Sequence, residues 1–487
     1  MDSNTPPSIK TLQELRDSGW IYRNIKAEMA HNAVQKLRDG KPIASGFIGY
    51  EDSVLPDLAN ALIAGHDIIL LGERGQGKSR LVRSLVELLD EWMPIVEGTE
   101  LNDNPYDPIS PLGKKIVEDQ GENTPIAWVS SRDRYGEKLA TPDTSVADLI
   151  GEVDPIKIAE GRYLSDELVL HYGLIPRTNR GIFAINELPD LAERIQVGLF
   201  NILEERDVQI RGFKIRLPLD IFLVASANPE DYTNRGRIVT PLKDRFGAQI
   251  RTHYPKDVPS EIKVVQQEAS HIEGLGVKVT VPKFMLEIVA ALSQLARLSP
   301  HVNQRSGVSV RLSITNYENL VANAIRRSIS VGEEEAVPRV SDLSALVSST
   351  MGKVEIESFD EGGDEEIVNK LLKAATLAVF KEHVPSETFG SIVAAFENGA
   401  VIHVGDDLSS DSYKIAMELS PGLQEPVFKL AGSESPGCIA SAMELVLEGL
   451  HLSKRLNKDS IGNKSTYRAR QESPNARVFR RDSLSDD

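Results

Sequence analysis

The residue types best suited to chemistry lie at positions 72–79, where the chain reads GERGQGKS. Gly72 and Gly77 are expected to adopt unusual backbone dihedrals and to let the main chain come close to a ligand. Successive amide N–H groups, together with a helix N-terminus, would then direct positive charge at phosphate oxygens. Lys78 is expected to reach the outer phosphates, and Ser79 to place its hydroxyl on Mg²⁺. The pattern therefore predicts a site for a nucleoside triphosphate and Mg²⁺.

The elements predicted on either side of these residues distinguish a phosphate-binding loop from a simple glycine turn. An apolar run at 68–71 precedes the loop, and leucines at helical spacing follow it over 81–89. A strand, a glycine loop and a helix in that order are the context that a phosphate-binding loop requires. A solvated glycine turn with the same letters would need neither neighbour. The sequence therefore favours the phosphate-binding loop.

Three further apolar runs, at 126–130, 181–185 and 221–226, predict buried strands. Helical patterns lie between them. Strands that alternate with helices indicate an α/β fold with a parallel sheet covered on both faces. The polar stretch over 92–125 lacks an apolar period and is predicted to be an insertion loop.

Polar side chains follow two of these predicted strands. Asn186 and Glu187 come directly after one strand, and Asn228 follows the next. Ligands of open α/β sheets bind beyond the carboxyl ends of the strands. Glu187 is therefore predicted to orient and deprotonate an attacking water, and Asn228 to hold that water or the γ-phosphate. The alternatives are a helix N-terminal acid at Glu187 and a simple turn at Asn228 and Pro229.

Composition narrows the class of protein. A chain of 487 residues has room for about two to four domains. One cysteine, Cys438, allows neither an internal disulfide nor a Cys-rich zinc site, which fits a reducing compartment. With no signal-peptide pattern and no apolar run of about 20 residues, we expect a cytoplasmic protein without a membrane span. The net charge of −17 argues against general nucleic-acid binding.

Five segments along the chain resemble one family of ATPases. In order they read GERGQGKS, IFAINELPDL, FLVASANPEDY, PLKDRFG and, at 309–311, SVR. Together they resemble AAA+ ATPases, and within these the magnesium chelatase subunit I and MoxR-like group, over about residues 46–330. The resemblance implies a parallel-sheet core followed by a helical lid, with ATP and Mg²⁺ as cofactors. It also implies a homo-oligomeric ring, expected to be a hexamer.

The resemblance gives roles to three arginines. Arg245 matches the arginine finger that would reach the ATP of the adjacent subunit, and Arg237 is a second candidate. A guanidinium suits that role because it stays charged and offers a fork of donors. Arg311 matches the lid arginine that senses nucleotide within its own chain. The alternatives are an ion pair of Arg245 with Asp244, and pairing of Arg311 with acidic surface groups.

The resemblance also extends the nucleotide site around Lys78. Ile48 and Gly49 match the segment that lines the adenine pocket. Within the loop, it assigns Gly75, Gln76 and Arg80 to the nucleotide as well.

One position departs from the family pattern. An aspartate usually precedes the catalytic glutamate, whereas here Asn186 precedes Glu187. Asn186 keeps an oxygen for Mg²⁺, beside Ser79, but lacks the negative charge that favours a hydrated cation. We therefore expect slow hydrolysis, or Mg²⁺ held chiefly through Ser79 and the phosphates.

Sequence patterns divide the chain into five regions. An N-terminal helical segment over 1–45 precedes an α/β nucleotide-binding domain over 46–255. Helical spacing then predicts a lid domain over 256–350 and a further mainly helical region over 351–453. Residues 454–487 are basic and poor in apolar side chains. They are predicted to be a disordered tail, and only there would contact with nucleic acid or an acidic partner be expected.

The leading hypothesis is an ATPase motor that works at the subunit interfaces of a ring. Its target would be a client protein or a partner with a von Willebrand type A domain. Segments 161–174 and 194–212 resemble the family's remodelling surfaces, the second being a helix and hairpin that face the central channel. Two alternatives stay open. One is the motor subunit of a true Mg or Co chelatase, and the other is a nucleotide-gated scaffold with little hydrolysis.

Overall fold

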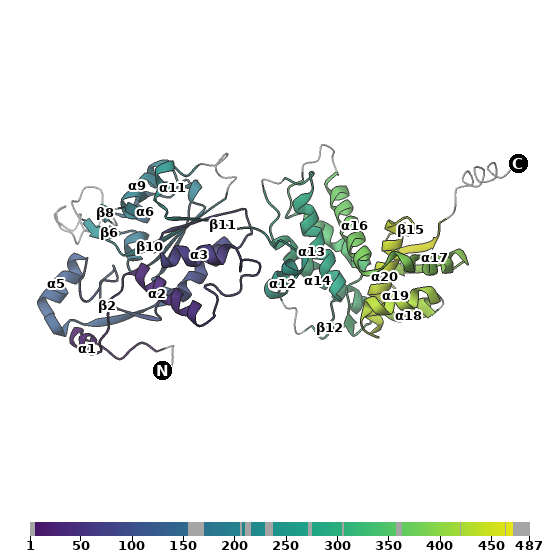
Figure 1. Cartoon of the computed structure of the whole chain (residues 1–487), viewed down its shortest axis with the longest axis horizontal. Helices are drawn as coiled ribbons and strands as arrows, with labels where there is room; N and C mark the ends of the chain where they lie inside the picture. The colour runs from purple at the N-terminus through teal and green to yellow at the C-terminus, as the bar shows by residue number, and fades with distance from the viewer. Residues whose placement is uncertain are drawn as a thin grey trace. The chain divides into compact units, whose positions relative to one another are not determined.

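The computed structural model divides the chain into a first unit, Met1–His253, and a second unit, Tyr254–Asp487. Figure 1 shows helices around a sheet in the first unit and mostly helices in the second. The finer division into five regions stays a prediction. The structure describes residues 5–153, 170–204, 207–209, 216–228, 237–270, 275–303, 306–356, 363–418, 420–462 and 464–470.

A five-stranded parallel sheet forms the centre of the first unit, in the order β11-β1-β10-β7-β4. All residues of the three inner strands are buried, which requires cover on both faces. The predicted α/β fold is therefore confirmed. The strands are β1 (Ile68–Leu71), β4 (Tyr135–Leu139), β7 (Gly181–Asn186), β10 (Ile221–Ala227) and β11 (Ala248–Arg251).

Alternate residues of the sheet enter two separate apolar layers, because successive side chains of a strand point to opposite faces. Ile68 and Ile182 lie in one layer, and Ile69 and Phe183 lie in the other. The first layer is completed by α2 (Ile25–Arg38), α3 (Val54–Ile63) and α4 (Lys78–Ser84), and the second by α9 (Glu193–Glu204) and α11 (Thr240–Arg245). The sheet thus fixes the loop before α4 and the ends of β7 and β10 at one edge.

The region over 92–139 corrects two predictions. The expected insertion loop contains a strand, β2 (Trp92–Val96), and a helix, α5 (Pro111–Gln120). The run at β3 (Ile126–Ser130) pairs antiparallel with β2 and does not join the main sheet. β4 is the strand that joins the main sheet at this edge. It was not predicted, because its polar residues do not give an apolar run. An edge strand can carry such residues because one side of it has no neighbouring strand.

The hairpin predicted after α9 is present as β8 (Asp207–Gln209) and β9 (Arg216–Pro218), which pair antiparallel. Its tip lies outside the described residues, as does most of the resembling segment 161–174. Smaller elements of this unit are α1 (Leu12–Asp17), η1 (Leu85–Leu88), η2 (Gly121–Asn123), η3 (Ser131–Arg134), α6 (Val146–Leu149), β5 (Gly151–Val153), β6 (Leu170–Tyr172), α8 (Leu174–Arg177) and η5 (Leu188–Asp190).

The second unit is mainly helical, as predicted. One apolar core joins most of its helices around α20, whose residues from Gly437 to Leu450 are all buried. Within the part of the chain that the structure describes, no helix has the length and apolarity to cross a membrane. The helices are α12 (Val258–Glu268), α13 (Lys283–Leu298), α14 (Arg311–Val331), η6 (Val340–Ala345), α15 (Leu346–Met351), α16 (Gly363–His383), η7 (Ser386–Thr388), α17 (Phe389–Glu397), α18 (Ser410–Glu418), α19 (Pro421–Ala431) and α20 (Pro436–Leu452).

The prediction of a disordered tail from residue 454 is wrong for its first part. β15 (Leu456–Ile461) and β16 (Lys464–Ala469) form an antiparallel sheet with β14 (Ile402–Gly405). Two apolar side chains, Leu456 and Tyr467, are buried in the unit's core and account for the order. Residues beyond 470 lie outside the described part. A second small sheet pairs β12 (Lys278–Val279) with β13 (Glu335–Ala336).

Candidate active site

The glycine loop between β1 and α4 owes its shape to two different properties of glycine. Gly75 and Gly77 have φ of 74° and 76°, a region that glycine enters without the steric cost of a Cβ. Gly72 does not adopt a positive φ, contrary to expectation. It is needed for space, because a Cβ there would lie 2.0 Å from Thr252 Oγ1 and 2.2 Å from Gln76 Oε1. Gly77 is also the N-cap of α4, so the loop leads directly into a helix N-terminus.

Lys78 is buried at the start of α4, with 7% of its surface exposed. Its Nζ donates to the carbonyl oxygens of Gly72 at 2.5 Å and Glu73 at 2.8 Å, and to Asn228 Oδ1 at 2.6 Å. The ammonium is therefore held inside the loop at the end of β10. Ser79 follows in the first turn of α4 and is half-buried.

Asn228 links the loop to the predicted base. Its side chain is buried, and its Nδ2 donates to Glu187 Oε2 at 2.7 Å while its Oδ1 accepts from Lys78. One amide thus joins an ammonium from α4 to a carboxylate that follows β7. The structure brings these three predicted residues together, as expected for the carboxyl ends of neighbouring parallel strands.

Glu187 has an unusual backbone for a residue other than glycine. Its φ of 55° and ψ of 47° are left-handed, a conformation that costs about 1–2 kcal/mol for such residues. The side chain makes no capping hydrogen bond to the 3₁₀ turn η5 that follows. Because the carboxylate contacts Asn228 instead, the geometry favours a role in the site over that of a helix N-terminal acid.

Asn186, the residue in place of the usual aspartate, is buried with both ends of its amide engaged. Its Nδ2 donates to Glu137 Oε1 in a short contact, and its Oδ1 accepts from Ser226 Oγ at 3.1 Å. Glu137 in turn accepts two hydrogen bonds of 2.9 Å from Arg83 of α4. The Arg83 guanidinium lowers the pKa of Glu137, so this carboxylate is charged at neutral pH.

Sequence reasoning missed Glu137. It lies within the short polar strand β4, where no motif marks it. The register of β4 against β7 places Leu139 opposite Asn186 and Glu137 opposite Ala184. Because residues two apart on a strand share a face, Glu137 and Asn186 point to the same side of the sheet. A single acid in a short polar segment gave no signal, since the pairing of β4 with β7 could not be predicted from the sequence.

The segment expected to line the adenine pocket packs against the glycine loop. Tyr50 donates from its hydroxyl to the Gln76 carbonyl oxygen at 2.5 Å, and its ring stacks on Phe47 with a centroid separation of 6.1 Å. Burial raises the pKa of Tyr50 to about 12, so the phenol remains a neutral donor. Ile48 and Gly49 lie between these two aromatic residues. Their contact with adenine stays a prediction.

The loop residues Gln76 and Arg80 take different positions. Gln76 is buried, and its Oε1 accepts from Thr252 Oγ1 at 2.7 Å, which closes the base of the loop against the end of β11. Arg80 is exposed, and its guanidinium lies 5.4 Å from the centre of the Phe47 ring. Phe47 was not predicted as a site residue, although an aromatic beside a phosphate loop is well suited to contact a base.

None of the three predicted arginines belongs to the glycine loop, to α4 or to the ends of β7 and β10. Arg245 ends α11, where its guanidinium lies 4.8 Å from the centre of the Phe200 ring and donates to the Pro241 carbonyl at 2.9 Å. Arg237 is exposed and lies 4.0 Å from Glu193. Arg311 begins α14 in the second unit and is exposed. Their roles stay predictions.

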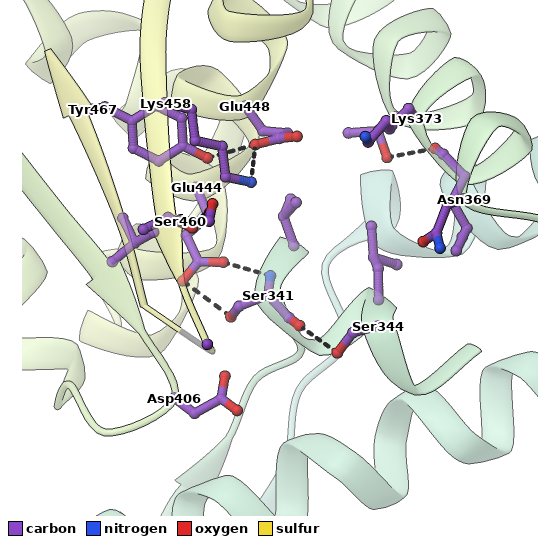
Figure 2. Close-up of a pocket in the computed structure, with 17 residues that line it drawn as sticks. Ser341, Ser344, Asn369, Lys373, Asp406, Glu444, Glu448, Lys458, Ser460 and Tyr467 are labelled. Atoms are coloured by element: carbon purple, nitrogen blue, oxygen red, sulfur yellow. Dashed lines mark hydrogen bonds and ion pairs between the residues drawn. The ribbon is translucent and has the colours of Figure 1, made fainter. Parts of the chain in front are cut away.

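The second unit contains a cavity of about 250 Å³ lined by α16, α20, η6 and the β14-β16-β15 sheet. Figure 2 shows Glu448 of α20 bonded to Lys458 and Tyr467. The Glu448 carboxylate accepts from Lys458 Nζ at 2.7 Å and from the Tyr467 hydroxyl at 2.5 Å. Burial raises the pKa of Glu444, which accepts from Ser341 in the same view. These acids are satisfied by neighbours in the unit, and no predicted site residue lines the cavity.

The known proteins similar in sequence to this chain include magnesium-chelatase subunits. No family model matches the chain. The chain is similar to magnesium-chelatase subunit ChlI of Nephroselmis olivacea, with 25% identity over 348 residues that cover 65% of this chain and 91% of that protein. The magnesium-chelatase 38 kDa subunit of Rhodobacter capsulatus is 29% identical over 240 residues, or 47% of this chain and 60% of that protein.

Solved structures resemble the chain more distantly. A structure of the complex between subunits BchI and BchD of magnesium chelatase matches with a TM-score of 0.34 and 20% identity, covering 66% of this chain and 97% of that one. NtrX from Brucella abortus in complex with ATP matches with a TM-score of 0.38 and 13% identity, covering 72% and 66%.

Proposed function

Because this chain is an AAA+ protein related to subunit I of magnesium chelatase, we propose that it binds ATP at the glycine loop and hydrolyses it to ADP and phosphate. The observation that carries the proposal is the hydrogen-bonded series Lys78, Asn228 and Glu187. In this series an ammonium, an amide and a carboxylate lie together at one edge of the sheet, which supports the roles proposed for them. A glycine turn without a ligand would not require that arrangement.

The residues divide the chemistry between them. Loop amides and Lys78 stabilise the negative charge of the phosphates. Glu187 orients the attacking water and takes its proton, while Asn228 fixes the carboxylate through the bond at 2.7 Å. Arg245 of an adjacent copy neutralises the charge that develops on the γ-phosphoryl group.

The donor set also fits Mg²⁺, a cation that prefers oxygen ligands. The amide nitrogen of Asn186 is bonded to Glu137, so its oxygen is the end that keeps acceptor capacity beside Ser226. The Ser79 hydroxyl and the Asn186 oxygen would hold the ion, which when bound neutralises phosphate charge. The other assigned contacts, from Gly75, Gln76 and Arg80, would complete the nucleotide site.

ATP hydrolysis could drive either of two functions. In the first, a hexameric ring in the cytoplasm remodels a client protein or a von Willebrand type A partner, as a MoxR-like chaperone. In the second, the chain is the motor subunit of a metal chelatase, which the names of its curated relatives favour at least as well. A scaffold with little hydrolysis has less support, because Glu187 and Asn228 are both in place.

Specific ATPase activity tests the proposal. We expect it to rise with protein concentration, since the finger must come from another copy, and to fall by about a thousandfold in Arg245→Ala. Arg177→Ala is the matched control, because its guanidinium is exposed, lies 3.5 Å from Glu100 and has no proposed role in the site. Nucleotide binding should persist in both variants. Flat specific activity, or full activity in Arg245→Ala, would argue against catalysis between copies.

A further inference from the structure

We propose that Glu137 supplies, from β4, the acidic group that β7 lacks at Asn186, and that position 186 is an amide because this carboxylate contacts it. The inference rests on the proposed function, since it concerns how the same site attracts its divalent cation. The negative charge that the family pattern has at the end of β7 would here come from the neighbouring strand β4. Glu137 would act as a positioning residue through Asn186.

The geometry sets the two side chains as partners. Glu137 and Asn186 lie on the same face of adjacent strands, and the amide nitrogen donates to Glu137 Oε1. Ser226 holds the amide oxygen at 3.1 Å. The amide can satisfy both neighbours only in this orientation, because Glu137 accepts and the Ser226 hydroxyl donates.

An aspartate at position 186 would face a carboxylate at short range. Two like charges so close cannot both remain ionised without a large cost. A carboxylate paired with an amide avoids that cost and still leaves one negative charge at this edge of the sheet. We therefore explain Asn186 and Glu137 together: the acidic group lies on β4, and β7 carries an amide that can pair with it.

Arg83 places this carboxylate on the side of the sheet where the cation is expected. It comes four residues after Ser79 on α4, so both side chains share one face of that helix. Its guanidinium binds both Glu137 oxygens at 2.9 Å and is 62% exposed at the side chain. Because solvent screens an exposed guanidinium, Arg83 orients Glu137 and only partly cancels its charge.

A purely structural role makes a different prediction. If the pair of Arg83 and Glu137 only ties the edge strand β4 to α4, its loss would lower stability without changing affinity for a cation. Metal affinity in the presence of nucleotide therefore separates the two roles.

The experiment measures Mn²⁺ binding by electron paramagnetic resonance in the presence of a non-hydrolysable ATP analogue. Glu137→Gln should weaken Mn²⁺ affinity by about tenfold, the scale expected for groups that support metal ligands. Asn186→Asp alone should not tighten binding. The double variant Glu137→Gln with Asn186→Asp should recover the parent affinity to within about threefold, since it restores one acid and one amide.

Two controls make the outcome decisive. Glu87→Gln removes another acid of the first unit that pairs with a cation, Lys36, and should leave Mn²⁺ affinity unchanged. Binding of the analogue in EDTA reports the loop alone. If it is normal while Glu137→Gln binds Mn²⁺ like the parent, or Asn186→Asp binds it more tightly, the inference is wrong and the proposed function stands. If no variant or parent binds the analogue, the proposed function itself fails.

Discussion

Asn228 is the residue through which the candidate site is organised. Its oxygen accepts from Lys78 and its nitrogen donates to Glu187, so both ends of one small side chain are used. An amide can do this because it carries an acceptor and two donors, whereas an aspartate offers acceptors only. The orientation of Glu187 is thereby coupled to the position of the loop cation, although the two residues belong to different elements.

A residue of the second unit gives a prediction about pH. Glu335 accepts from Ser435 at 2.5 Å and Thr280 at 2.6 Å and pairs with Lys278 at 3.0 Å. The Ser435 hydrogen bond, followed by that of Thr280, lowers the pKa of Glu335 below its ordinary 4.5. A pKa that is lower in the folded state stabilises the protein above 4.5, and this stability is lost as pH falls through the folded value.

Glu335→Gln should therefore lower the free energy of unfolding by about 1–2 kcal/mol at neutral pH. The difference from the parent should shrink as pH falls below the ordinary pKa, because both proteins are then uncharged at that position. Scanning calorimetry at several pH values measures it, with the exposed neighbour Glu334→Gln as the control. An equal loss at neutral and acid pH would show that charge at Glu335 plays no part.

At the scale of elements, α2 is fixed to the core of the first unit by charged groups. Glu28 receives two hydrogen bonds from Arg134, at 2.7 and 2.6 Å, and both side chains are almost fully buried. Lys26 pairs with Asp67 at 2.9 Å, just before β1. The N-terminal segment, whose role was not evident from sequence, thus packs as part of the α/β unit.

Removal of one partner of the buried pair should be costly, because the other charge is left without compensation. Glu28→Ala should lower the free energy of unfolding of the first unit by about 3–5 kcal/mol. The chain's three tryptophans, Trp20, Trp92 and Trp128, all lie in that unit, so their fluorescence in urea reports it selectively. Glu118→Ala, at an exposed position of α5, should change little. A loss under about 1 kcal/mol for Glu28→Ala would contradict the account.

Elements with strong apolar patterns could be predicted, and those held by distant partners could not. The runs that became β1, β7 and β10 are buried on both faces, so apolar composition revealed them. β4 was missed because an edge strand tolerates Glu137 and Lys138. β15 and β16 were read as disordered because their order depends on contacts with α20, such as Lys458 with Glu448 at 2.7 Å.

The candidate site likewise contains residues that could be predicted from the sequence and one that could not. The glycine loop, Glu187 and Asn228 follow from motif and strand order, and the structure brings them together. Glu137 is separated from Asn186 by 49 positions, and only the pairing of two strands makes them neighbours. No local pattern could have supplied that contact.

At the scale of the whole molecule, the proposed machinery draws on both units and on a second copy of the chain. The loop and base belong to the first unit, Arg311 to the second, and Arg245 is proposed to serve another copy. Such a distribution would make hydrolysis depend on assembly and on the lid, so that ATP turnover could move one part against another.

The most direct test of the central claim is calorimetric titration of the full chain with Mg-ATP. The account predicts saturable binding that is lost in Lys78→Ala and retained in Lys36→Ala, which removes a half-buried ammonium paired with Glu87. The reason is that Lys78 provides the buried cation at the loop. No binding heat from the parent protein, or a Lys78→Ala variant that binds as the parent does, would contradict it.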